Sequence, residues 1–181
     1  FGRGVGEAEG LLLNGSGEML QQDRQIKTIR KHLVKKVIDS LKALSKEDPE
    51  QYRKFWAEFG PVVKEGLLDY EEKRDRIFDL MLAPSSASET ELVSISEYVE
   101  RMPESQQAIY YIAGPKLDVL RRSPHLEAFK EKGIEVLFLT DPVDEVWVGQ
   151  GPVTYQDKPW KSIGHGEVEL GSEEDKEKAK E

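Results

Sequence analysis

The spacing of apolar residues changes once along this chain, near Pro84, and that change limits its fold more than any other feature. From Ile26 to Leu82, apolar residues recur at steps of three and four, which is the period of amphipathic helices. After Pro84 they gather in short runs rich in branched and aromatic residues, AIYYIAG at 108–114 and IEVLFLTD at 134–141. Such runs are typical of buried strands. The sequence therefore predicts a helical part followed by a smaller α/β part.

Three helices are expected in the first part. Ser16 can cap the start of the first, whose apolar stripe runs to Leu44. Pro49 suits the first turn of the second helix, which is expected to break at Gly60-Pro61, and a third helical pattern spans 67–82. We expect these helices to pack as a coil. The polar run PSSASETE that follows is expected to be a loop or a boundary between subdomains.

The second part has the order strand, two helices, strand, which predicts a parallel pair with a crossover. Ser96 is expected to cap a short helix ahead of the first strand, and the segment 153–163 is expected to form a final hairpin. The predicted fold class is α/β: a three-helix coil followed by a small α/β/α layer with a short, largely parallel sheet. The expected divisions are an irregular lead-in at 1–15, the helical coil at 16–84, the α/β subdomain at 85–166 and a charged linker at 167–181.

Composition argues against several classes of function. The chain has no cysteine, which removes disulfides, thiolate metal sites and cysteine nucleophiles and fits a reducing cytoplasm. A net charge of −9 disfavours generic binding of nucleic acid. The histidines, His32, His125 and His165, lie far apart without ligand spacing, so no metal site is expected. No apolar run approaches the roughly 20 residues of a membrane span.

A serine hydrolase is one alternative, with Ser123, His125 and Asp141 as its catalytic groups. No Gly-x-Ser-x-Gly elbow or other nucleophile geometry supports it. The Ser123-Pro124-His125 segment is better explained as a helix-capping turn.

Six stretches of the sequence, in their order along the chain, resemble the bacterial branch of the ninety-kilodalton heat-shock chaperone family. They are LNGSGEMLQQ, IRKHLVKKVIDSL, FWAEFGPVVKEG, AIYYIAG, SPHLEAFKEKGIEVLFLTDPVDE and KPWKSIG. Each alone would be weak evidence, whereas six in the expected order make a chance match improbable. The resemblance implies that the chain is the latter part of the family's middle segment.

That resemblance implies a cytoplasmic, homodimeric chaperone driven by ATP and Mg. Its N-terminal domain binds ATP, its middle segment completes hydrolysis and contacts unfolded or partly folded client proteins, and its C-terminal domain dimerises. Because this chain corresponds to only part of that assembly, we expect it to hold no cofactor and to be no enzyme by itself. No nucleic acid or membrane partner is expected. A stand-alone partner-binding adaptor is the alternative.

The resemblance also assigns a loop that approaches the γ-phosphate of ATP. Asn14, Ser16 and Glu18 match residues that support this loop, and Gln21 matches its catalytic glutamine. Gly17 stands where the family has an arginine. The expected catalytic contribution of this chain is therefore Gln21 alone.

A client-binding surface is expected at Asp144, Glu145 and Trp147, where the family has Asp-Glu-Trp without the intervening Val146. Tryptophan is enriched at binding hot spots because it offers a large amphipathic surface. We expect Trp147 to be the exposed aromatic of this surface. The alternative is a tryptophan packed in the core or against the hairpin.

Overall fold

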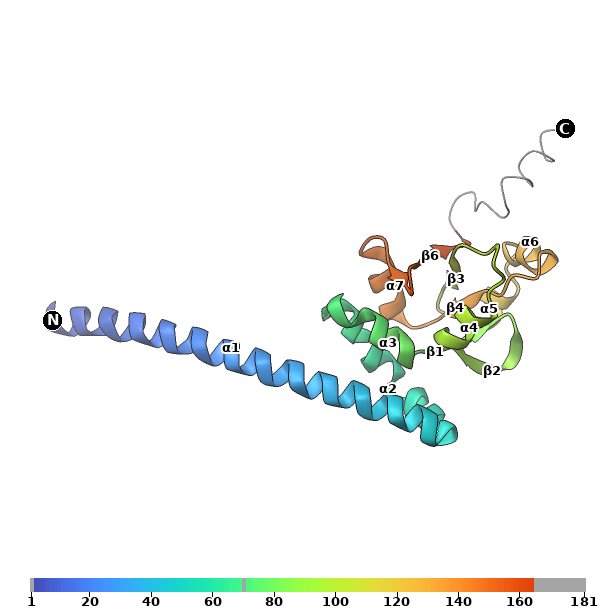
Figure 1. The fold of residues 1–181 in the computed structure, drawn as a ribbon. Coiled ribbons are helices and arrows are strands. Elements are labelled where there is room, and N and C mark those ends of the chain that lie inside the picture. The colour runs from blue at the N-terminus through green and yellow to red at the C-terminus, as the bar shows by residue number, and fades with distance from the viewer. Residues whose placement is uncertain (1, 70, 165–181) are drawn as a thin grey trace. The chain divides into compact units, whose positions relative to one another are not determined.

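The computed structural model describes residues 2–69 and 71–164, and their side chains from residue 16 onward except that of residue 71 (Figure 1). The predicted charged linker at 167–181 lies outside the described residues. The chain divides into two compact units, Phe1–Ala43 and Leu44–Glu181, which are treated separately below. The helices expected to form the second and third members of a coil therefore share a unit with the sheet.

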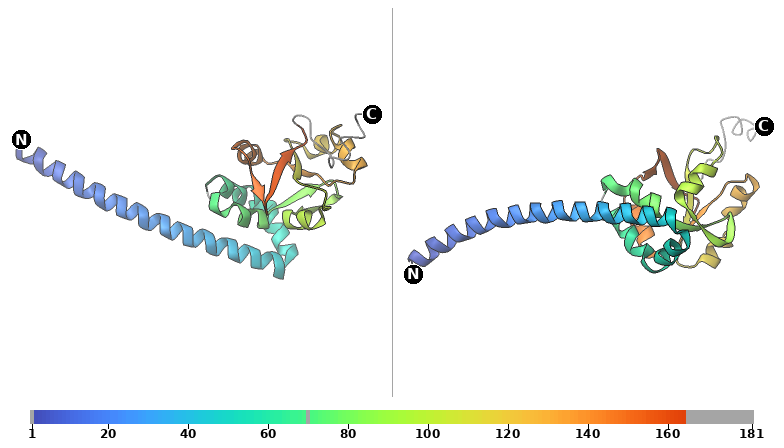
Figure 2. Two further views of the ribbon diagram at one scale, coloured as in Figure 1. Left: turned by 45° about the horizontal axis from the view of Figure 1, so that its top comes forward. Right: turned by 60° about the horizontal axis from the view of Figure 1, so that its bottom comes forward.

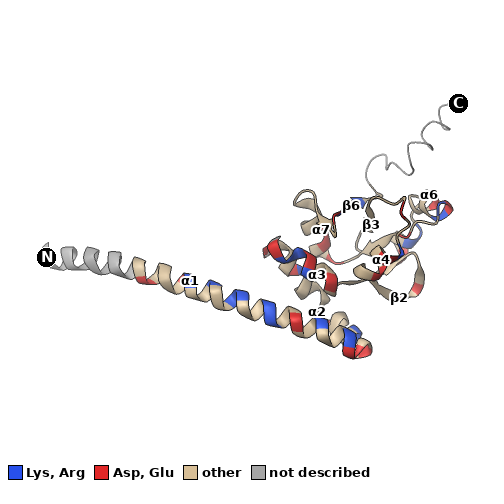
Figure 3. Ribbon diagram, in the orientation of Figure 1, with Lys and Arg blue, Asp and Glu red and all other residues tan. Residues whose placement is uncertain are grey.

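Helix α1 runs from Gly2 to Glu47. The prediction of an irregular lead-in at 1–15 is wrong for residues 2–15, whose backbone is helical. Glycine lowers helix propensity by about 1 kcal/mol relative to alanine without excluding the helix, and the leucines at 11–13 favour it. Lysines and arginines recur along the described part of this helix (Figure 3). Its apolar stripe is exposed over much of its length, with Ile29 58% and Leu33 57% accessible.

Helix α2 spans Pro49–Asp69 and begins at Pro49 as predicted. The expected break at Gly60-Pro61 is wrong, because Pro61 lies inside the helix. A proline there removes the hydrogen bond to the carbonyl of Ala57, but Ala57 is exposed, so water can satisfy that carbonyl. Gly60 is needed for packing, since a Cβ atom at that position would lie 2.9 Å from Cε2 of Trp56.

The region between α2 and the sheet differs from the sequence prediction. A short 3-10 turn η1 (Glu71–Lys73) and helix α3 (Arg74–Leu80) replace the expected third long helix. The polar run expected to be a loop forms a hairpin instead, with strands β1 (Leu82–Ser85) and β2 (Ser88–Ser94). The hairpin pairs in antiparallel register, with Ala83 opposite Val93. Burial alternates along β1, and its buried residues, Ala83 and Ser85, face the core.

Helix α4 (Ile95–Arg101) begins two residues earlier than expected, because Ser94 and not Ser96 is its cap. The Ser94 side chain accepts from the Glu97 backbone N–H at 3.0 Å, and the Glu97 side chain accepts from the Ser94 N–H. This reciprocal capping box satisfies two backbone donors that the helix leaves free. The remaining elements are β3 (Ile109–Ala113), α5 (Leu117–Arg121), α6 (Leu126–Glu131), β4 (Leu137–Leu139), α7 (Pro142–Gly149), β5 (Thr154–Tyr155) and β6 (Lys158–Ser162).

The strands of the described chain form one six-stranded sheet in the order β2-β1-β4-β3-β6-β5. The parallel pairing of β3 with β4 across α5 and α6 confirms the predicted crossover. Strand β6 is also parallel to β3, whereas β2, β1 and β5 pair antiparallel to their neighbours, so the sheet is mixed. The predicted final hairpin is confirmed. It turns at Gln156 and Asp157, whose φ angles of 49° and 62° suit a two-residue hairpin loop.

Adjacent residues of β3 identify the two faces of the sheet. The Tyr110 ring packs edge-on against Phe129 of α6 at 5.0 Å, while the next ring, Tyr111, lies 6.1 Å from Trp160. Trp160 in turn contacts α3 through Phe78 and α7 through Trp147. Helices therefore cover both faces of the sheet (Figure 2), which confirms the predicted α/β/α layering.

Candidate binding surface

Helix α7 holds the three residues expected to bind clients, but it exposes only one of them. Asp144 and Trp147 are buried, with 0% and 1% of their surface accessible. The prediction that Trp147 is exposed is therefore wrong. Residues three apart lie on the same face of a helix, so a buried Asp144 places Trp147 on the buried face as well. Glu145 is exposed, and so is Val146, which is 50% accessible.

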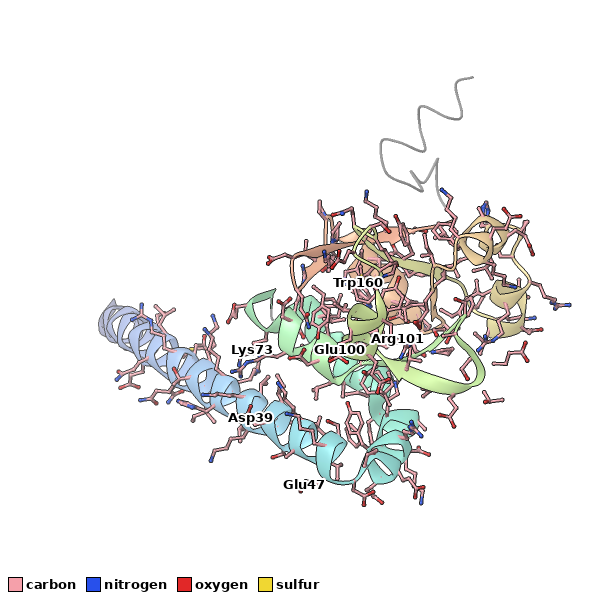
Figure 4. The ribbon with its side chains drawn as sticks, turned by 45° about the vertical axis from the view of Figure 1, so that its right-hand side comes forward. Asp39, Glu47, Lys73, Glu100, Arg101 and Trp160 are labelled. Carbon is pink, nitrogen blue, oxygen red and sulfur yellow. The ribbon has the colours of Figure 1, made fainter. Side chains whose placement is uncertain are left out.

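Trp147 is part of an aromatic cluster between α7, α3 and the sheet. The centroid of its ring lies 5.4 Å from that of Phe78 and 5.1 Å from that of Trp160, and both pairs are edge-on. Figure 4 shows Trp160, the member of the cluster contributed by β6. The Trp147 indole Nε1 donates to Asp144 Oδ1 at 2.9 Å, so its polar atom is satisfied inside the core. Trp147 therefore fixes α7 to the sheet.

A buried ion cluster attaches α7 to α2. Lys64 Nζ lies 2.9 Å from Asp141 Oδ2 and 3.0 Å from Asp144 Oδ2. Asp144 Oδ2 also accepts from the Asp141 backbone N–H at 3.0 Å. Both Lys64 and Asp144 are enclosed, with side chains 5% and 0% accessible. Burying a charge is costly unless it is paired and hydrogen-bonded, and the Asp144 carboxylate accepts from three donors.

Lys64 is the residue that sequence reasoning missed. It lies on the ridge that α2 buries, four positions after Gly60 and eight after Trp56. A single lysine at the spacing of a buried apolar ridge indicates a buried ion pair, since lysine is almost never fully buried unless it is paired. The sequence does not name its partners, which lie about 80 residues further along the chain.

The exposed side of α7 and the neighbouring helix α2 offer apolar surface to a partner. The two helices pack on each other. On α2, Phe59 and Val62 are 52% and 60% accessible, and the Phe59 ring stacks on Phe55 at 5.3 Å. On α7, Val146 is exposed beside the carboxylate of Glu145. Exposed apolar side chains next to charge can bind extended or unfolded polypeptide by burial of apolar surface.

The segment expected to be a loop near ATP is helical. Ser16, Glu18 and Gln21 lie on α1 and are exposed, while the Asn14 side chain lies outside the described side chains. Apart from the adjoining residues and the backbone of α1 itself, no atom lies within 4 Å of a Cβ placed on Gly17, so a side chain can begin there without a clash. The prediction of a loop is wrong for this segment, whereas the role of Gln21 remains a prediction.

The other chemistry considered from the sequence gains no support. Ser123 Oγ accepts from the backbone N–H of His125 at 3.3 Å, while Asp141 is engaged by Lys64, so these residues form no nucleophile and base pair in the described contacts. Within residues 2–69 and 71–164, no group of three or more His, Asp or Glu side chains could hold a metal ion. The described helices include none with the length and apolarity to cross a bilayer.

These observations define an α/β module with helices on both faces of a mixed sheet and an exposed apolar and acidic helix surface. Its fold is similar to the middle domain of a Plasmodium falciparum heat shock protein, with a TM-score of 0.69 and 28% identity. That match covers 77% of this chain and 58% of the other. The Hsp90 protein family model matches residues 1–181.

The curated relatives are bacterial chaperones. The chain is 51% identical over 179 residues to the chaperone protein HtpG of Mycobacterium tuberculosis H37Rv, and 53% identical over 177 residues to that of Nocardia farcinica. These alignments cover 99% and 97% of the chain but 28% and 27% of the relatives. The chain therefore belongs to the Hsp90 protein family, as the resemblance implied, and spans a little over a quarter of the length of these relatives.

Proposed function

We propose that this chain is the middle-segment module of an ATP-driven chaperone and that it contacts unfolded client proteins through the exposed side of α7. The observation that carries the proposal is the exposure of one side of α7. Glu145 and Val146 face outward from a helix whose other side is fixed by Trp147 and by the Lys64 ion cluster. A contact surface on a rigid helix loses little conformational entropy when a flexible client binds.

The wider setting of this function is also proposed. The module acts in the cytoplasm between an N-terminal ATP-binding domain and a C-terminal dimerisation domain of the same protein. ATP and Mg belong to the N-terminal domain, and Gln21 approaches the nucleotide from α1. The chain of residues 1–181 alone is expected neither to bind nor to hydrolyse ATP, and calorimetry with ATP and Mg measures this directly.

The test of the client surface uses Val146→Asp in this chain and a fluorescently labelled, permanently unfolded protein. A charge at position 146 removes the apolar contact and adds a group that resists desolvation, so binding is expected to weaken about tenfold, worth roughly 1.4 kcal/mol. Fluorescence anisotropy measures the affinity. Urea unfolding of the same variant should be unchanged, because the side chain is already exposed.

Val119→Asp is the matched control, since Val119 is 54% accessible and lies on α5, away from the proposed surface. It should leave client affinity within about twofold of the parent chain. Equal loss of affinity in both variants would show that net charge, and not the α7 surface, governs binding, and the proposal would then be abandoned.

A further inference from the structure

A separate cavity of about 420 Å³ lies where α4 and α6 end and the segment before β4 begins. Charged and apolar side chains line it together. The charged ones are Arg101, Lys130 and Glu135, and the apolar ones are Met102, Pro103 and Ile134. Its volume falls in the lower part of the range of about 300–1,000 Å³ found for small-molecule sites, so it suits a compact ligand.

Hydrogen bonds hold the charged wall of the cavity in place. Glu135 accepts from Arg101 Nε at 3.1 Å and from Arg101 Nη2 at 2.9 Å, and Ser85 Oγ donates to its other oxygen at 2.8 Å. Figure 4 shows Arg101 at the end of α4. The hydrogen bonds that Arg101 donates to the Glu135 carboxylate raise the pKa of Arg101, so the guanidinium stays charged. The side chains that would meet a ligand are thus largely pre-formed.

The floor of the cavity is equally fixed. Tyr98 OH donates to the Glu135 carbonyl at 2.8 Å and accepts from Gln106 Nε2 at 2.8 Å and from the Tyr110 backbone N–H at 3.0 Å. Burial raises the pKa of Tyr98 to about 12, so this hydroxyl remains a neutral donor at ordinary pH. Tyr98 and Gln106 are 1% and 6% accessible.

The charge of the lining is opposite to that of the whole chain. Arg101 and Lys130 are cationic and Glu135 is anionic, which leaves one net positive charge in a chain of net charge −9. The hydrogen bonds to Glu135 use Nε and Nη2 of Arg101, whereas Nη1 donates no hydrogen bond to the described residues. Lys130 forms no ion pair with the described residues. Two cationic donors therefore remain for an anion.

We propose that this cavity binds a compact apolar carboxylate, such as the C-terminal residue of a peptide, with the carboxylate at Arg101 and Lys130 and the apolar group against Met102, Pro103 and Ile134. The ligand must carry its charge and its apolar group within one residue, because both kinds of wall belong to a single small cavity. A free N–H of a guanidinium donates a charge-assisted hydrogen bond to a carboxylate, as an ammonium group does. The site is distinct from the α7 surface and does not depend on the proposed function.

The test is a titration of this chain followed by NMR of the Ile134 and Met102 methyl groups. The probes are N-acetyl-leucine, N-acetyl-leucinamide, and an acetylated tetrapeptide that ends in leucine with a free carboxylate. Saturable shifts with a dissociation constant near about 1 mM are expected for both acids, and at least about tenfold weaker binding for the amide. A peptide affinity at least about threefold above that of N-acetyl-leucine identifies a peptide terminus as the ligand, whereas equal affinity identifies a small carboxylate.

Lys130→Gln is the decisive variant, because Lys130 is exposed and makes no described contact that folding needs. It should weaken both acids about threefold or more, while Lys116→Gln, an exposed lysine outside the cavity, should change affinity by less than about 1.5-fold. Arg101→Gln is less informative alone, since it also removes the partner of Glu135. Equal binding of acid and amide, unchanged affinity in Lys130→Gln, or no methyl shift at about 10 mM probe would each overturn the proposal.

Discussion

The buried ion cluster between α2 and α7 makes Lys64→Met the most discriminating stability test in this chain. Methionine retains much of the length and apolar volume of lysine, so the substitution removes the charge with little change in packing. It leaves Asp144 with a fully buried carboxylate and no cation. Removing one partner of a buried pair costs about 3–5 kcal/mol, because the other charge stays desolvated without compensation.

The local contacts place the expected loss near the lower end of that range. Asp144 keeps two donors after the substitution, the Trp147 indole N–H at 2.9 Å and the Asp141 backbone N–H at 3.0 Å. Asp141 is partly open to water, with 31% of its side chain accessible, so solvent can replace its lost partner. We therefore expect Lys64→Met to lower the free energy of unfolding by about 3 kcal/mol.

Urea unfolding followed by tryptophan fluorescence measures this loss. The three tryptophans of the chain, Trp56, Trp147 and Trp160, all belong to the unit that begins at Leu44, so the signal reports on the part that contains the cluster. The control is Arg122→Met, which removes an exposed ion pair with Asp118, 3.3 Å apart and 75% and 74% accessible. It should cost less than about 0.5 kcal/mol.

A double-mutant cycle separates the ion pair from simple packing. Asp144→Asn combined with Lys64→Met removes both charges of the inner pair, so the double variant should be at least about 1 kcal/mol more stable than the sum of the single losses predicts. A loss below about 1 kcal/mol in Lys64→Met, or additive single losses, would refute the view that this pair governs the attachment of α7.

Three other outcomes are expected. Gly60→Ala should lower the free energy of unfolding by about 1–3 kcal/mol, because its Cβ would lie 2.9 Å from the Trp56 ring. Gly17→Ala meets no such neighbour, and alanine favours a helix more than glycine does, so the helix content measured by far-ultraviolet circular dichroism should rise. The contribution of Tyr98 to stability should be constant below about pH 10 and fall between about pH 10 and 12, since Tyr98 ionises first in the unfolded chain. Tyr98→Phe, less stable at pH 8, should therefore show a smaller fall over that range in pH-dependent urea unfolding. Gly17→Arg can be tested in a chimaera in which this chain replaces the matching segment of the Mycobacterium tuberculosis protein. If this segment approaches ATP as proposed, the substitution should raise ATP turnover at least about tenfold with unchanged nucleotide affinity. Equal turnover would contradict that role.

The parts of the fold that were predicted correctly are those whose signal is local. The strand at β3 is a continuous apolar run buried on both faces, and the hairpin turns at Gln156 and Asp157, of which Asp157 is a residue type that tolerates positive φ. Strand β2 escaped prediction because it lies at the edge of the sheet. Its exposed Glu89 and Glu91 are poor strand formers, and only pairing with β1 makes it a strand.

Errors in the helices have a different cause, since local preference was outweighed by context. Pro61 breaks an isolated helix, but here Trp56, Gly60 and Lys64 bury the same side of α2 before and after it. Packing on that side keeps the axis continuous, and only an exposed carbonyl loses its partner. Tertiary burial of this kind is not visible in a window of neighbouring residues.

The candidate site shows most clearly what spacing can and cannot decide. Successive residues of a helix are rotated by about 100°, so Trp147 lies about 60° from Asp144 around the axis while Val146 lies about 160° from it. Once Lys64 fixes Asp144 inside the core, the indole must follow it inward and position 146 must face solvent. The outward position directly after Asp-Glu, where the resemblance implied an aromatic, is therefore filled by valine in this chain. Valine buries less apolar area than tryptophan, so this surface should bind unfolded protein more weakly than one that presents an aromatic there.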